Sequence, residues 1–256
     1  MPVYDSPLRG EPVWIELFSS DPGRAIHFYS ELFGWTDAPE SSQRAGYVNF
    51  LLRGRPVAGL MRNDPASAMI DEWTVYLDVP DAGATCARAN RYGGSVLTSE
   101  PVANLGVMLL LRDPSGSLVG GWEAQERGGF EVFREAGAPS WLELHTRSYA
   151  AAVRFYENVF GWRTSEIGRT DEDRYSVLGT WEEPRAGIQD AAATLPDNAP
   201  SRWMVYFGVS DVDRAADRVE ELGGSVIEPP SDSDFGRVTT VTDPTGAVLR
   251  LMRGNR

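Results

Sequence analysis

Glu143 and His145 stand two positions apart near the middle of the chain. In a β-strand both side chains would point to the same face, because successive residues alternate between the two faces. A carboxyl beside an imidazole can act as a general acid/base pair. The two groups can equally satisfy each other's hydrogen-bonding capacity in a purely structural role, and the sequence leaves both alternatives open.

The other reactive side chains narrow the chemistry further. All 24 basic residues are arginine, which excludes a lysine Schiff base. Cys86 is the single cysteine, so no intramolecular disulfide can form.

A net charge of −13 argues against nucleic acid and anionic membranes as partners. No apolar run approaches the ~18 residues that span a bilayer, so we expect a cytoplasmic protein. For the oligomeric state we expect a monomer or a homodimer.

The segment that contains Glu143 repeats an earlier one. Four residue pairs recur at an offset of 127 positions: Trp14/Trp141, Glu16/Glu143, Tyr29/Tyr156 and Trp35/Trp162. Three later segments recur at an offset of 130: Trp73 to Tyr76 with Trp203 to Tyr206, Gly93-Gly94 with Gly223-Gly224, and Asp113 to Gly116 with Asp243 to Gly246. The chain is therefore an internal duplication. We expect a first domain over 1–124, a linker over 125–139 and a second domain over 140–256.

Each copy shows one pattern of elements twice. A strand over 13–18 precedes a helix that Asp21-Pro22 opens and Gly34 ends, and strands over 47–52 and 56–61 follow. The second half repeats this with a strand over 74–79, a helix from Asp81 to Arg91, and strands on either side of a turn at 113–116. We expect an α+β fold of two tandem domains. Each would be a pair of βαβββ modules forming a curved, cupped mixed sheet with helices on the outside.

The order of these motifs resembles the vicinal oxygen chelate superfamily, which includes glyoxalase I, extradiol dioxygenases and bleomycin-resistance proteins. The tandem two-domain actinobacterial type is the most similar. The resemblance implies a pocket in each cup and, in metal-using members, ligands of the His, Gln or Glu type at three positions. These positions fall at Trp14, Thr74 and Gly120 in the first copy and at Trp141, Met204 and Arg250 in the second. Such residues are poor ligands for a divalent metal, so we expect neither a metal nor another cofactor.

Alternation along the strands predicts which side chains face each pocket. The ligand-binding candidates are Trp14, Glu16, Phe18, Tyr76, Asp78 and Trp122 in the first copy, and Trp141, Glu143, His145, Met204, Tyr206 and Arg250 in the second. Aromatic walls with a few polar groups are typical of sites for bulky aromatic small molecules. The same rings could instead fill the cups, and Arg250 could pair with Glu143.

Three hypotheses follow for the function. The first is metal-independent binding of a bulky aromatic small molecule, as in natural-product or antibiotic sequestration. The second is a metal-independent enzyme or auxiliary hydroxylase-type protein of antibiotic biosynthesis, with Glu143 and His145 as the catalytic pair. The third is a scaffold with vestigial pockets. Because the copies differ at Phe18/His145, Asp78/Gly208 and Gly120/Arg250, we expect the second domain to hold the richer chemistry.

Overall fold

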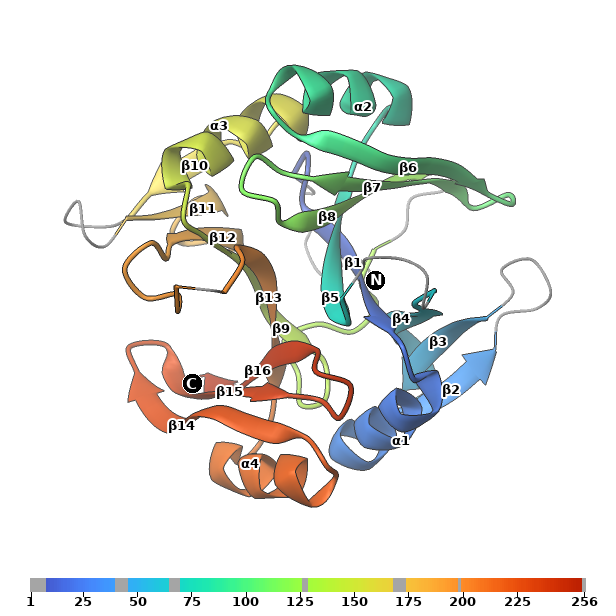
Figure 1. Cartoon of the computed structure of the whole chain (residues 1–256), viewed down its shortest axis with the longest axis vertical. Helices are drawn as coiled ribbons and strands as arrows, with labels where there is room; N and C mark the ends of the chain where they lie inside the picture. Colours follow the sequence, from blue (N-terminus) through green and yellow to red (C-terminus); the bar gives the residue numbers. More distant parts are fainter. Residues whose placement is uncertain are drawn as a thin grey trace.

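A computed structural model describes residues 8–39, 46–64, 70–125, 129–167, 174–197 and 199–254. It contains two eight-stranded mixed sheets, one for each sequence repeat (Figure 1). The strand orders are β2-β3-β4-β1-β5-β8-β7-β6 and β10-β11-β12-β9-β13-β16-β15-β14, so the second sheet repeats the first. The expected α+β fold of two tandem domains, each a pair of βαβββ modules, is confirmed.

The elements follow the same order in both domains. The first domain contains β1 (Pro12–Ser19), α1 (Pro22–Phe33), β2 (Thr36–Pro39), β3 (Tyr47–Leu52), β4 (Arg55–Arg62), β5 (Glu72–Asp78), α2 (Ala82–Arg91), β6 (Ser95–Val102), β7 (Gly106–Arg112) and β8 (Leu118–Ala124). The second contains β9 (Pro139–Thr146), α3 (Tyr149–Val159), β10 (Thr164–Glu166), β11 (Tyr175–Gly179), β12 (Pro184–Asp190), β13 (Arg202–Gly208), α4 (Val212–Glu221), β14 (Ser225–Ser233), β15 (Gly236–Thr242) and β16 (Val248–Gly254). The sequence did not anticipate the short edge strands β2 and β10.

Local signals explain where the first helix begins and ends. The Asp21 side chain accepts a hydrogen bond from the Arg24 backbone N–H at 3.2 Å, and Pro22 occupies the first turn, where its missing N–H costs nothing. Gly34 ends the helix with a φ of 71°, a conformation that a residue without a Cβ adopts freely. The predicted start and end of this helix are therefore confirmed.

Sheet register places equivalent residues at the centre of both domains. In the first sheet Trp14 pairs with Tyr76 across β1 and β5, and Tyr76 pairs with Gly120 across β5 and β8. In the second sheet the same row runs Trp141, Tyr206, Arg250. The two rows differ in residue type only at the last position, which is Gly120 in the first sheet and Arg250 in the second.

The domains pack through their helices and share one hydrophobic core. Helix α1 lies beside α4, and α2 beside α3 (Figure 1). Tyr29 on α1 donates a hydrogen bond to Asp243 at 3.0 Å, and Tyr156 on α3 donates one to Asp113 at 3.2 Å. Each hydroxyl in turn accepts from a buried tryptophan indole. The interface is thus built twice from equivalent residues.

The interdomain linker packs against the first domain. Phe130 and Val132 are buried, and Glu135 forms ion pairs with Arg53 and Arg55 at the β3–β4 turn. The described part of the linker therefore packs against the protein; residues 126–128 lie outside the described residues. Among the described helices, none is long and apolar enough to cross a membrane.

Candidate functional site: the cup of the first domain

A cavity of about 200 Å³ lies over the central row of the first sheet. Four aromatic side chains line it: Trp14, Tyr47, Tyr76 and Trp122. Other lining residues are the apolar Val13, Val102, Leu105 and Met108, the polar Glu16 and Asn49, and Gly129 of the linker. Among the described lining residues, Glu16 is the only one with a charged side chain.

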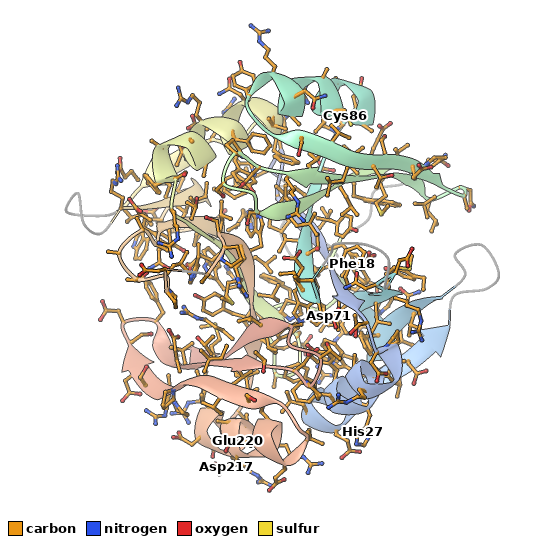
Figure 2. The ribbon with its side chains drawn as sticks, viewed as in Figure 1. Phe18, His27, Asp71, Cys86, Asp217 and Glu220 are labelled. Carbon is orange, nitrogen blue, oxygen red and sulfur yellow. The ribbon has the colours of Figure 1, made fainter. Side chains whose placement is uncertain are left out.

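Four of the six residues predicted to face the first pocket line this cavity: Trp14, Glu16, Tyr76 and Trp122. Phe18 and Asp78 are not among the lining residues. Phe18 is buried in a small apolar cluster with Val13, Tyr76, Leu110 and Leu118. Figure 2 labels Phe18 and also His27, which is exposed on α1. Asp78 is half-buried at the end of β5, where its backbone N–H donates to the Glu11 carbonyl.

Sequence reasoning missed two aromatic residues that contact Trp14: Tyr47, which lines the cavity, and Phe130, which is not among the lining residues. The Trp14 indole donates a hydrogen bond to the Tyr47 hydroxyl at 3.1 Å, and its ring stacks on Phe130 of the linker with 6.3 Å between centroids. Tyr47 lies directly over Gly59, where a Cβ would stand 2.1 Å from its hydroxyl. The sequence held a signal for this, because Tyr47/Tyr175 and Gly59/Gly187 both recur at an offset of 128 positions, and Tyr175 lies over Gly187 in the same way.

Glu16 and Tyr76 form the polar floor of the cavity. Glu16 is only 2% exposed, and the Tyr76 hydroxyl donates a hydrogen bond to its Oε1 at 3.1 Å. The Tyr76 ring rests on Gly120, since a Cβ there would stand 2.3 Å from the ring. A side chain at position 120 would therefore displace the tyrosine.

The second cup contains a dense hydrogen-bond network centred on Glu143. His145 Nε2 lies 2.6 Å from Glu143 Oε1, and the carboxylate also accepts from Tyr206 at 2.9 Å, from Trp141 at 3.1 Å and from Tyr175. Burial alone would raise the pKa of Glu143, but the hydrogen bonds and the charge of His145 outweigh it and lower that pKa to about 2. The two candidate catalytic residues are therefore together, and both are buried.

Arg250 fills the second cup. Its guanidinium donates to the Tyr206 hydroxyl at 2.7 Å, to Thr240 at 2.9 Å and to Glu228 at 3.2 Å, and it lies 5.4 Å from the centre of the Tyr206 ring. The anticipated pair with Glu143 is thus replaced by one with Glu228, because the long side chain carries the charge beyond Tyr206 to β14. Met204, the remaining candidate, is buried beside Glu143 in the adjacent strand.

This cavity lies in the first domain, whereas the comparison of the copies had pointed to the second domain as the one with the richer chemistry. The central rows of the two cups differ at one pair of positions. Gly120 contributes no side chain to the first cup, whereas the equivalent Arg250 spans the second.

The superfamily's metal positions do not fit a divalent ion in either cup. In the first they provide an indole, the Thr74 hydroxyl and no side chain at all. Thr74 Oγ1 is buried and has no hydrogen-bond partner within the described part of the chain, but a neutral hydroxyl is a weak ligand. In the second they provide an indole, a thioether and a guanidinium. The described ranges contain no group of three or more His, Cys, Asp or Glu residues that could hold a metal.

The model of the glyoxalase/bleomycin resistance protein/dioxygenase superfamily matches residues 12–120 and 139–251. The chain belongs to this superfamily. It is 31% identical over 259 residues to the glyoxylase-like protein CFP32 of Mycobacterium tuberculosis, covering 99% of this chain and 98% of the relative. It is 34% identical over 264 residues to the anthracycline biosynthesis protein DnrV of Streptomyces peucetius, covering 96% and 94%. The expected resemblance is confirmed.

Solved structures share the fold at lower sequence identity. The 2,3-dioxygenase LapB from Pseudomonas sp. KL28 has a TM-score of 0.65 at 17% identity, covering 98% of this chain and 94% of that one. The Mn(II)-bound glyoxalase from Novosphingobium aromaticivorans has a TM-score of 0.64 at 19% identity, covering 96% and 82%. At these identities the similarity concerns the architecture alone.

Proposed function

We propose that the cup of the first domain binds an aromatic small molecule without a metal ion, in antibiotic biosynthesis or resistance. The observation that carries this proposal is the cavity itself, about 200 Å³ and lined by two tryptophans and two tyrosines. Flat rings stack favourably on such walls. Met108 adds an adaptable surface, and Glu16 and Asn49 provide polar groups that can orient a ligand.

The superfamily and the curated relatives support the biological setting. Two relatives are named as anthracycline biosynthesis proteins, and each matches more than nine-tenths of this chain. A ligand with fused aromatic rings agrees with those names and with the aromatic lining of the cavity. The metal-position residues of both cups argue against the chemistry of metal-using members, because none of them is a good ligand.

Titration calorimetry on the full chain tests the proposal, with an anthracycline as the ligand. Trp14→Ala and Trp141→Ala form a matched pair, since the two tryptophans are equivalent in the repeat. Loss of a stacking wall should weaken binding about tenfold in Trp14→Ala. Trp141→Ala should bind as the wild type does. Equal losses in both variants, or no binding by the wild type, would contradict the proposal.

Catalysis by Glu143 and His145 has less support from the geometry. Glu143 and His145 are 7% and 5% exposed, and Tyr206, Trp141 and Tyr175 already donate hydrogen bonds to the Glu143 carboxylate. A substrate would have to displace these side chains before it reached that carboxylate. The role of the pair as acid and base stays a prediction. It would be supported if Glu143→Gln abolished catalytic turnover of a bound compound while its affinity for that compound stayed unchanged.

A further inference from the structure

The second cup contains a cation, the guanidinium of Arg250, beside Tyr206 and Glu143. The guanidinium of Arg250 lies over the Tyr206 ring and donates to the Tyr206 hydroxyl, which itself donates to Glu143. Glu143 also favours the charged form of Arg250 through space. The cation is therefore bound by the Tyr206 ring and hydroxyl and by Thr240 and Glu228, with the buried Glu143 carboxylate nearby.

The first cup keeps the tyrosine and carboxyl groups of this arrangement and has a glycine at the position equivalent to Arg250. Tyr76 and Glu16 occupy the positions of Tyr206 and Glu143, and their hydroxyl–carboxyl hydrogen bond is 3.1 Å against 2.9 Å in the second cup. Gly120 stands where Arg250 stands. The surrounding positions have changed to match, because Leu110 replaces Thr240 and Thr98 replaces Glu228, two of the partners that anchor the arginine.

The walls of the first cup favour positive charge. Glu16 has partners within the protein, Tyr76 among them, and it places a carboxyl at the floor of an otherwise largely apolar cavity. The negative potential of a carboxylate is screened little in such surroundings. The faces of Trp14, Trp122 and the tyrosines attract cations through their quadrupoles.

We propose that the ligand of the first cup is an aromatic compound with a positively charged nitrogen, and that this nitrogen binds beside Glu16 and Tyr76. This inference rests on the proposed function and specifies the ligand class. The ligand then supplies from outside the charge that Arg250 supplies from within the second domain. A neutral ring system of the same size should bind more weakly, and an anionic one more weakly still.

Three acridines of one ring size test the inference by calorimetry on the full chain: protonated 9-aminoacridine, neutral acridone and anionic acridine-9-carboxylate. We expect one 9-aminoacridine per chain, bound about tenfold or more tightly than acridone, and the weakest binding for the carboxylate. Glu16→Gln should remove the preference for the cation. Glu220→Gln is the control, because it removes the same charge from an exposed residue on helix α4 of the second domain, and it should keep the preference.

The control matters because a chain with a net charge of −13 attracts cations non-specifically. Equal binding of the cation and acridone, or a preference that survives Glu16→Gln, would overturn the inference and leave the proposed function standing, since an aromatic ligand would still bind. Binding of none of the three would overturn both. If Glu16→Gln fails to fold, the wild-type titrations at high salt decide the question, because salt screens the attraction by the net charge more than a contact inside the cavity. A preference for the cation that persists at high salt supports the inference, and one that disappears overturns it.

Discussion

Gly120 and Arg250 occupy equivalent positions in the central rows of the two sheets, each beside a tyrosine in the neighbouring strand. In the first domain the Tyr76 ring lies flat against Gly120, and a cavity remains above it. In the second domain the Arg250 side chain extends across Tyr206 to Glu228. One framework thus provides an open cup and a filled one.

Arg250→Gly should destabilise the second domain. The substitution removes three hydrogen bonds, leaves the Tyr206 hydroxyl without its donor and opens a void beside it. We expect a loss of about 2–4 kcal/mol in the free energy of unfolding, because a partly buried charged donor is lost together with its packing. Urea denaturation measures the change. Arg253→Gly, at an exposed position on the same strand, is the control. Unchanged stability would show that Arg250 does not fill the cup.

His145→Phe should change how stability depends on pH. Phenylalanine is the residue of the first copy at this position, so the shape is tolerated there. The folded-state pKa of Glu143 is lowered from 4.5 to about 2, so its contribution is present above pH 4.5 and is lost as pH falls towards 2. Without the hydrogen bond and charge of His145 the pKa of Glu143 rises. The variant should therefore lose less free energy of unfolding than the wild type when the pH is lowered.

Urea unfolding of both proteins between pH 7 and pH 3 tests this. The variant should be about 1–3 kcal/mol less stable at pH 7, the range for a hydrogen bond to a charged group. The difference between variant and wild type should shrink as the solution is acidified. A constant difference over the whole range would contradict the assigned role of His145.

The fold followed from the sequence because its signals are local or repeated. Asp21 and Gly34 mark helix ends by their own chemistry, and the duplicated tryptophans and glycines fix the alignment of the copies. Alternation along the central strands identified Trp14 and Tyr76 as residues that face the pocket. The rest of the site depends on how the strands pair, since Met108 belongs to β7 and reaches the cup because the register places it beside Trp122 of β8.

The filling of the second cup could not be predicted for a related reason. Arginine has a long side chain whose end point depends on partners in other strands. Thr240 and Glu228, on β15 and β14, are identified only once the sheet is built. The contact between Phe130 and Trp14 could not be predicted either, because a linker has no periodic pattern that would show which side chain Phe130 packs against.

Tyr29→Phe and Tyr156→Phe should each weaken the domain interface. Each removes a hydrogen bond to a buried aspartate, Asp243 or Asp113, whose pKa burial raises. A raised pKa means that the ionised carboxyl disfavours the folded state at neutral pH and that the cost falls as pH drops through the folded-state value. The tyrosine hydroxyl offsets part of that cost when the aspartate is ionised.

We therefore expect each variant to lose about 1–3 kcal/mol at pH 7 and less near pH 4. Tyr92→Phe, a half-buried tyrosine outside these two networks, serves as the control. Denaturant unfolding followed by tryptophan fluorescence reports on both domains, because Trp73 and Trp203 take part in the networks. Equal losses at both pH values would contradict the role given to the aspartates.

Gly120→Arg tests the central claim most directly, because it gives the first cup the residue that fills the second. The added Cβ displaces the Tyr76 ring, and the side chain enters the cavity. Titration calorimetry with 9-aminoacridine should show one site in the wild type and no measurable site in the variant, while circular dichroism shows that both are folded. Binding with unchanged affinity and stoichiometry by folded Gly120→Arg would contradict the claim that the open cup of the first domain is the ligand site.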